Sequence, residues 1–157
     1  MRHTISVLVQ NRFGVLARVA GLFSARGYNI ASLAVSETTD PAVSYMTMVV
    51  EARDEKVLEQ IKKQLHKLID VITVSDFTNK PHVDRELVII KVCCCPKTRS
   101  KIEAVLHSYV GKLISCRDNV GIIEAVGDQA QIKKLLDEMK EYNIIELVRT
   151  GRVAMSY

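Results

Sequence analysis

The sequence is poor in the features that mark several classes of protein. It has only 7 glycines and 3 prolines among 157 residues, too few for a fibrous repeat or a long disordered linker. It contains no run of about 18 apolar residues, so we expect no transmembrane helix. Residues 1–4 lead into a short apolar segment without a signal-peptide cleavage site. These absences predict a cytoplasmic protein with no membrane partner.

Motifs for catalysis and for metal binding are also missing. There is no Walker loop, no Gly-x-Gly-x-x-Gly segment after a strand and no His-x-x-x-His pair. None of the 4 histidines neighbours a serine or cysteine in a recognised nucleophile pattern. We therefore predict no catalytic residue, no metal site and no enzymatic activity of this chain by itself.

The 4 cysteines include three in a row, Cys93 to Cys95, and do not suggest a disulfide framework. Neighbouring residues on a strand point to opposite faces, so the three thiols cannot converge on one metal without a bulge. A free cysteine in a strand is more often a small core residue. This usage fits the reducing cytoplasm.

The first half of the chain alternates short apolar strands with amphipathic helices. Val15, Val19 and Phe23 share one helix face, and Gly27 follows as a helix stop. Asp54 caps a second helix. The expected strands cover residues 4–9, 30–36, 43–50 and 71–75, with helices at 15–26 and after Asp54. This order is βαββαβ.

The second half repeats the order with little identity of sequence. Strands are expected at 87–95, 112–117, 120–126 and 144–149, with helices around 102–109 and after Asp128. A βαββαβ unit forms an antiparallel sheet with both helices on one face. We therefore predict an α+β protein of two tandem ferredoxin-like domains, at residues 1–77 and 85–157, joined by a linker at 78–84.

The other face of each predicted sheet carries no helix. In the first sheet, alternation places Val43, Tyr45 and Val49 on this open face, where apolar side chains need a cover. A domain of about 75 residues also has a marginal core when it stands alone. We therefore expect a partner sheet, domain or subunit, including a second copy of the chain.

The turn that joins the first strand to the first helix, residues 10–18, is a candidate ligand site. A helix that begins near Gly14 presents free backbone N–H groups and a positive dipole end, which favour a carboxylate or phosphate. Gly14 lets a ligand approach the backbone, and Asn11 offers both a donor and an acceptor. Three nearby apolar residues suit an aliphatic side chain: Phe13, Val15 and Leu16. Alternatively, Asn11 only caps a turn and Gly14 only relieves a steric clash.

A second candidate is Asn29 with Ile30, just before a strand. Asparagine at such a place is most often a turn residue. A binding role for Asn29 requires that it face the turn at residues 10–18, either in the same chain or across a dimer.

These segments resemble a known family. The pattern Asn11-x-x-Gly14-x-Leu16 and residues 21–33, with the specific run 27–30, resemble the regulatory (small) subunit of acetolactate synthase, also called acetohydroxyacid synthase. The resemblance continues through residues 54–61, 64–68, 85–87 and 149–154, and so spans nearly the whole chain. Tyr45 departs from it, because the family pattern leads us to expect arginine there.

The resemblance implies a regulatory role. It implies that the first half is an ACT domain that pairs edge to edge with a second copy in a homodimer. A branched-chain amino acid, typically valine, then binds at the interface. The resemblance places its contacts at positions 11–16 of one chain (Asn11, Phe13, Gly14, Val15 and Leu16) and at Asn29 and Ile30 of the other.

The resemblance also implies a catalytic partner. The chain itself is expected to do no chemistry and to hold no cofactor. It is expected to bind a large catalytic subunit that carries thiamine diphosphate, Mg²⁺ and FAD, to raise its activity and to confer feedback inhibition.

Other functions of the same topology remain alternatives, and the closest is a tandem-ACT regulator of another pathway. An RNA-binding ferredoxin-like protein needs aromatic residues on its central strands. Phe13, Phe23 and Phe77 fall on a turn, a helix and the linker, and the net charge of +4 is not clustered, so we expect no nucleic-acid partner. A metallochaperone needs a Cys-x-x-Cys loop, which is absent.

Overall fold

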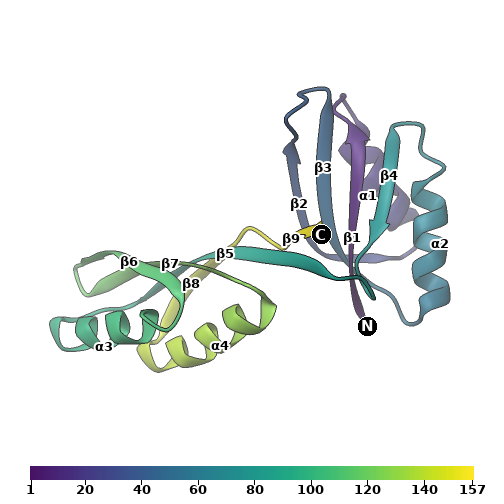
Figure 1. The fold of residues 1–157 in the computed structure, drawn as a ribbon. Helices are drawn as coiled ribbons and strands as arrows, with labels where there is room; N and C mark the ends of the chain where they lie inside the picture. Colours follow the sequence, from purple (N-terminus) through teal and green to yellow (C-terminus); the bar gives the residue numbers. More distant parts are fainter. The chain divides into compact units, whose positions relative to one another are not determined.

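In a computed structural model, which describes residues 1–157, the chain follows the order βαββαβ twice and ends in one further strand (Figure 1). The predicted fold class, with two antiparallel sheets and helices packed on them, is confirmed. The strands are β1 (Arg2–Gln10), β2 (Asn29–Glu37), β3 (Val43–Glu51), β4 (Val71–Asp76), β5 (His82–Cys93), β6 (Val110–Arg117), β7 (Val120–Gly127), β8 (Ile144–Arg149) and β9 (Val153–Ser156). The helices are α1 (Val15–Ala25), α2 (Glu55–Leu65), α3 (Pro96–Leu106), α4 (Gln129–Met139) and the short 3₁₀ helix η1 (Lys140–Tyr142).

The first sheet has the strand order β2-β3-β1-β4, with every neighbouring pair antiparallel. Alternate residues of its strands turn toward the helices, which is why β-branched and long apolar residues recur at every second position. The buried core of this sheet and its two helices comprises Ile5, Val7, Val9, Val15, Val19, Leu22, Phe23, Met46, Met48, Val50, Ala52, Leu58, Ile61 and Leu65. Each Val, Leu, Ile, Phe or Met side chain in this set contributes about 1.5–3 kcal/mol when it is fully buried.

The second sheet has the order β6-β7-β5-β8, and β9 pairs with β5. Its apolar face packs against α3 and α4 around a separate core of Val88, Ile90, Val92, Cys94, Ile102, Leu106, Ile123, Ala125, Ile132, Leu135 and Met139. Each of the two repeats therefore has its own hydrophobic core, formed between one face of its sheet and its two α-helices. Each of the four α-helices has 11 residues, fewer than the ~20 needed to span a bilayer.

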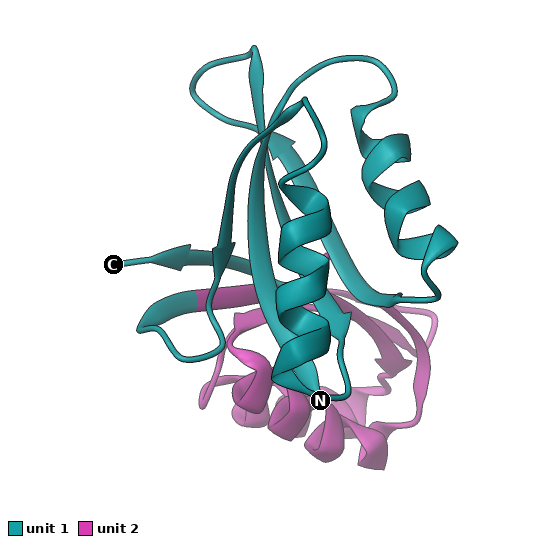
Figure 2. Ribbon diagram, turned by 90° about the vertical axis from the view of Figure 1, so that its right-hand side faces the viewer, with its two compact units in different colours: residues 1–83, 152–157 teal, residues 84–151 magenta.

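The chain separates into two compact units (Figure 2). The first unit contains residues 1–83 and 152–157, and the second contains residues 84–151. The sequence pattern placed residues 152–157 with the second repeat and put a linker at 78–84. In the structure β5 already begins at His82, and the last six residues group with the first unit although β9 pairs with β5.

The open face of the first sheet is partly covered by the chain's own C-terminus. Thr47 and Val49 of β3 are almost fully buried there, and Tyr45 of β3 donates a hydrogen bond from its hydroxyl to the Ala154 carbonyl of β9. We expected a partner sheet, domain or subunit as the cover. A segment more than a hundred residues away in the sequence supplies part of it instead.

Candidate ligand-binding site

The turn after β1 is held against the far end of β2 by Asn11. The Asn11 side-chain amide donates to Glu37 Oε1 at 3.0 Å and to the Pro41 carbonyl at 2.9 Å, and the Asn11 backbone N–H donates to the Ala42 carbonyl at 2.7 Å. These bonds connect the turn to the last residue of β2 and to the β2–β3 loop. The Asn11 carboxamide thus faces the edge of the sheet, beside an exposed carboxylate.

Helix α1 begins without a side-chain cap. Its N-cap residue, Gly14, has φ +80°, a left-handed conformation that favours glycine. No side chain accepts a capping hydrogen bond from the first backbone N–H groups of α1. The other three α-helices are capped by side chains, by Asp54 at α2, by Cys95 with Thr98 at α3 and by Asp128 with Gln131 at α4. The first turn of α1 therefore leaves backbone donors and the positive dipole end for an outside acceptor.

The apolar residues of this turn separate into two sets. Phe13 is fully exposed and Leu16 is about half exposed, with a relative exposure of 45%. Both side chains are available to a ligand or to a second chain. Val15 is buried in the core of the first unit, so its side chain supports the turn from below.

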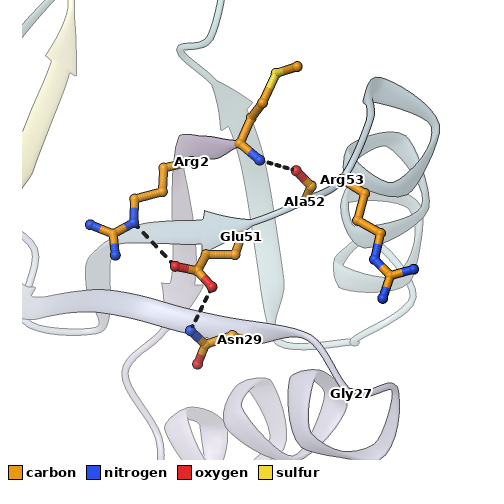
Figure 3. Close-up of a pocket in the computed structure, with 7 residues that line it drawn as sticks. Arg2, Gly27, Asn29, Glu51, Ala52 and Arg53 are labelled. Carbon is orange, nitrogen blue, oxygen red and sulfur yellow. Dashed lines mark hydrogen bonds and ion pairs between the residues drawn. The ribbon is translucent and has the colours of Figure 1, made fainter.

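Asn29 starts β2 at the other end of the sheet. Its side-chain amide donates to Glu51 Oε2 at 3.1 Å, and the Arg2 Nε donates to Glu51 Oε1 at 3.2 Å (Figure 3). The hydrogen bond from Asn29 and then that from Arg2 lower the pKa of Glu51, which keeps this carboxylate charged. The three side chains line a cavity of about 390 Å³ next to Gly27, and Ile30 packs against the core beside it.

The two groups of predicted site residues do not meet within one chain. Asn11 contacts Glu37, the last residue of β2, whereas Asn29 is its first. At about 3.3 Å per residue, the ends of this nine-residue strand lie roughly 26 Å apart. The structure therefore brings Asn11, Phe13, Gly14 and Leu16 together at one end of the sheet and leaves Asn29 and Ile30 at the other.

Arg18 is a residue at this turn that the sequence reasoning missed. It lies one helical turn after Gly14, and its guanidinium forms an ion pair of 2.7 Å with Asp70, whose side chain is almost buried. A Cβ added to Gly14 would lie 3.5 Å from Arg18 Nη1. The signal in the sequence was the four-residue spacing, which places the two positions on one helix face.

The cysteines occupy structural positions in the second unit. Cys94 is buried in the core, and burial, followed by the neighbouring Cys116, raises its pKa to about 11. Cys95 caps α3, and hydrogen bonds led by the Thr98 side chain lower its pKa. No group of three or more His, Cys, Asp or Glu side chains is arranged to hold a metal ion.

Comparison with known proteins gives evidence on the family of this chain that is independent of the geometry. Residues 5–73 match the family described as the AHAS small subunit-like ACT domain, and residues 85–157 match the small subunit of acetolactate synthase. The chain belongs to the acetolactate synthase small-subunit family. The resemblance recognised in the sequence is thereby confirmed.

Individual relatives agree with this family over nearly their whole length. A probable acetolactate synthase small subunit of Archaeoglobus fulgidus is 47% identical over 155 residues, which cover 99% of this chain and 96% of the relative. The isozyme 3 small subunit of Escherichia coli is 40% identical over 157 residues, with coverage of 99% and 96%. The crystal structure of the acetolactate synthase small subunit from Thermotoga maritima superposes with a TM-score of 0.89 at 34% identity, covering 100% of this chain and 98% of that one.

The two repeats match different models of this family. The first repeat matches the AHAS small subunit-like ACT domain at residues 5–73, and the second matches the small subunit of acetolactate synthase at residues 85–157. Both repeats therefore match models of one family, the acetolactate synthase small subunit.

Proposed function

We propose that this chain is the regulatory subunit of an acetolactate synthase. It binds the large catalytic subunit, raises its activity and makes it sensitive to a branched-chain amino acid, with valine as the expected effector. The observation that carries the ligand part is the uncapped start of α1 at Gly14, beside Asn11 and the exposed apolar side chains of Phe13 and Leu16. Membership of the small-subunit family supports the partner.

The chemistry of the turn suits an aliphatic amino acid. The free N–H groups of α1 match a carboxylate, since anions are favoured at a helix N-terminus. The Asn11 carboxamide and the Glu37 carboxylate, joined by a hydrogen bond of 3.0 Å, offer acceptors for an ammonium group. Phe13 and Leu16 are placed to cover a short branched side chain.

A second copy of the chain completes the site in this proposal. β2 is an edge strand of the first sheet, so one side of it has no strand partner in the chain. If two β2 strands pair in antiparallel fashion, the first residues of one lie beside the last residues of the other. Asn29 and Ile30 of one chain then approach Glu37, and through it the Asn11 turn, of its partner.

This arrangement explains regulation without chemistry in the chain itself. An effector shifts an equilibrium only through its different affinity for two states, and allosteric coupling is typically about 1–3 kcal/mol. An amino acid bound between two ACT domains favours one geometry of the dimer, and the attached catalytic subunit responds to it. We assign thiamine diphosphate, Mg²⁺ and FAD to that catalytic subunit, as the family resemblance implies.

The direct test is an acetolactate synthase assay with the cognate catalytic subunit. We expect the chain to raise the rate of acetolactate formation and valine to lower it again, with calorimetry ranking valine, leucine and isoleucine as ligands. If the chain neither stimulates the catalytic subunit nor makes it respond to any of the three, the proposed function is wrong.

The two-chain site has a sharper test in mixed dimers. Gly14→Asp and Asn29→His, each made in a separate preparation, should both weaken valine binding markedly. When the two preparations are mixed, random pairing restores about a quarter of the sites, because each mixed dimer contains one wholly wild-type site. Asn79→His, at an exposed residue of the segment before β5, is the matched control and should bind valine normally. A site contained in one chain would recover nothing on mixing.

A further inference from the structure

The C-terminal residues 152–156, here called the strap, are seated on the first sheet by hydroxyl groups. The Arg152 backbone N–H donates to Ser32 Oγ at 3.0 Å, and the Ala154 backbone N–H donates to Thr47 Oγ1 at 3.4 Å. In return the Tyr45 hydroxyl donates to the Ala154 carbonyl at 2.8 Å. These main-chain groups of the strap bond to side chains that stand on the face of the first sheet, and β9 also pairs with β5.

The strap spans three strands of that sheet. Ser32 lies on β2, Thr47 on β3 and Thr4 on β1, where the Arg152 guanidinium donates to Thr4 Oγ1 at 2.8 Å. Figure 1 shows β9 crossing the direction of β2 and β3 within this unit instead of running along them. A segment bonded to three strands at once responds to their relative displacement.

The hydrogen bond from Ala154 to Thr47 is shielded from water, and the other three bonds of the strap are partly buried. Thr47 has a relative exposure of 1% and Ala154 of 5%. A buried polar group that loses its partner costs more than an exposed one, so the Thr47 hydroxyl in particular fixes the position of the strap on the sheet. A small shift of the strands would break the bonds rather than stretch them smoothly.

The anchor on β2 lies beside the proposed effector contacts. The register of β2 against β3 shifts between Ile30 and Ser32, a local irregularity of the strand. Such a bulge interrupts the regular ladder and re-aims the side chains next to it. A change in the position of Asn29 and Ile30 would therefore displace Ser32 before the residues farther along β2.

We propose that the strap is a coupling element, which transmits the state of the effector site to the remainder of the chain. It follows directly on Gly151, the last residue of the second unit, so its anchor is a covalent connection between that unit and the regulatory sheet. Binding of the effector at β2 changes the position of Ser32. This change shifts the equilibrium between a strap that is hydrogen-bonded to the first sheet and one that is released from it. This inference rests on the proposed function and adds the route of regulation to it.

The experiment compares three altered chains with matched controls, each assayed with the catalytic subunit. A chain that ends at Gly151 lacks the strap, Ser32→Ala removes its acceptor on β2, and Tyr45→Phe removes the donor to Ala154. Ser36→Ala, on an exposed residue of β2, and Tyr157→Phe, on a residue that is 90% exposed, are the controls.

We expect stimulation of the catalytic subunit, and calorimetric valine binding by the chain alone, to stay within about two-fold of wild type in all five. The valine concentration for half-maximal inhibition should rise about ten-fold or more without the strap, and about 2–10-fold in Ser32→Ala and Tyr45→Phe, the range of one hydrogen bond. The controls should not change it.

The outcomes separate the two proposals. If the wild-type chain shows no valine effect, the proposed function fails and takes this inference with it. If wild type is inhibited and the strapless chain is inhibited equally, only the coupling role is overturned. If the strapless chain does not fold by circular dichroism, the two point variants decide. If Ser32→Ala abolishes valine binding by the chain alone, Ser32 belongs to the binding site and the coupling role is again overturned.

Discussion

Substitution of Gly14 separates the ligand site from the fold more cleanly than any other change. The residue has φ +80°, and any residue with a Cβ pays about 1–2 kcal/mol in this left-handed conformation, with asparagine and aspartate best tolerated. A Cβ there meets only Arg18 Nη1 at 3.5 Å, which is an ordinary contact. Both Gly14→Ala and Gly14→Asp should therefore fold, with unfolding free energies lower than wild type by about 1–2 kcal/mol.

The two substitutions should differ in ligand binding. The carboxylate introduced by Gly14→Asp stands at the start of α1, where the effector carboxylate is proposed to lie. Two like charges about 4 Å apart repel by about 1 kcal/mol in water and about 4 kcal/mol at an effective dielectric constant of 20. This range predicts valine binding that is weaker by about 5- to 1000-fold. The Arg18 guanidinium nearby moderates the repulsion, so values near the upper end require a site that is closed to water.

Three measurements complete this prediction. Thermal unfolding gives the stability of both variants, calorimetry gives their valine affinity, and co-elution with the catalytic subunit reports association. Association should be unchanged, because the change lies at the ligand turn. Valine binding by Gly14→Asp within two-fold of wild type would falsify the assignment of the carboxylate site to α1. Equal losses in Gly14→Ala and Gly14→Asp would instead attribute the effect to the backbone, not to charge.

Two further predictions concern stability and thiol reactivity. Gly21 lies inside α1 with open space around its Cβ position, so Gly21→Ala should stabilise the protein by about 0.5–1 kcal/mol. Gly121→Ala brings a Cβ within 2.7 Å of Cys94 Cβ and should destabilise the protein by about 1–3 kcal/mol. Denaturant unfolding measures both free energies, and a stabilising Gly121→Ala would contradict the packing around Cys94. Because the pKa of Cys95 is lowered by Thr98 and that of the buried Cys94 is raised, iodoacetamide at pH 7.5 should label Cys95 long before Cys94. Thr98→Val should slow the labelling of Cys95, as followed by mass spectrometry, and equal rates for the two thiols in the folded protein would refute this.

Much of the fold follows from local patterns in the sequence. The period-2 strands and period-3.6 helices in each half predict both sheets and both cores, because burial of one face imposes that spacing on the residues themselves. Caps such as Asp54 and Asp128 mark helix starts for the same local reason, since each side chain bonds a backbone N–H three residues away. The start of β5 at His82 was missed because residues 82–86 carry a polar, weakly alternating pattern.

The candidate site was only half readable in this way. Gly14 and Asn11 are neighbours in the sequence, so the character of their turn follows from residue type and spacing. That Val15 points into the core depends on how α1 packs on the sheet. That Asn29 lies at the opposite end of β2 from Asn11 depends on strand order, which no single segment encodes.

The sequence by itself determined the two βαββαβ repeats, the candidate turn around Gly14 and the family resemblance, because each rests on short-range periodicity or on contiguous residues. Only the tertiary structure decided that the site residues of one chain are separated and that the C-terminal strap lies on the first sheet. Arg152 and Ser32 are 120 positions apart and meet through one backbone N–H and one hydroxyl. A single polar contact of that kind has no periodic signature, so it becomes visible only when both sheets are folded.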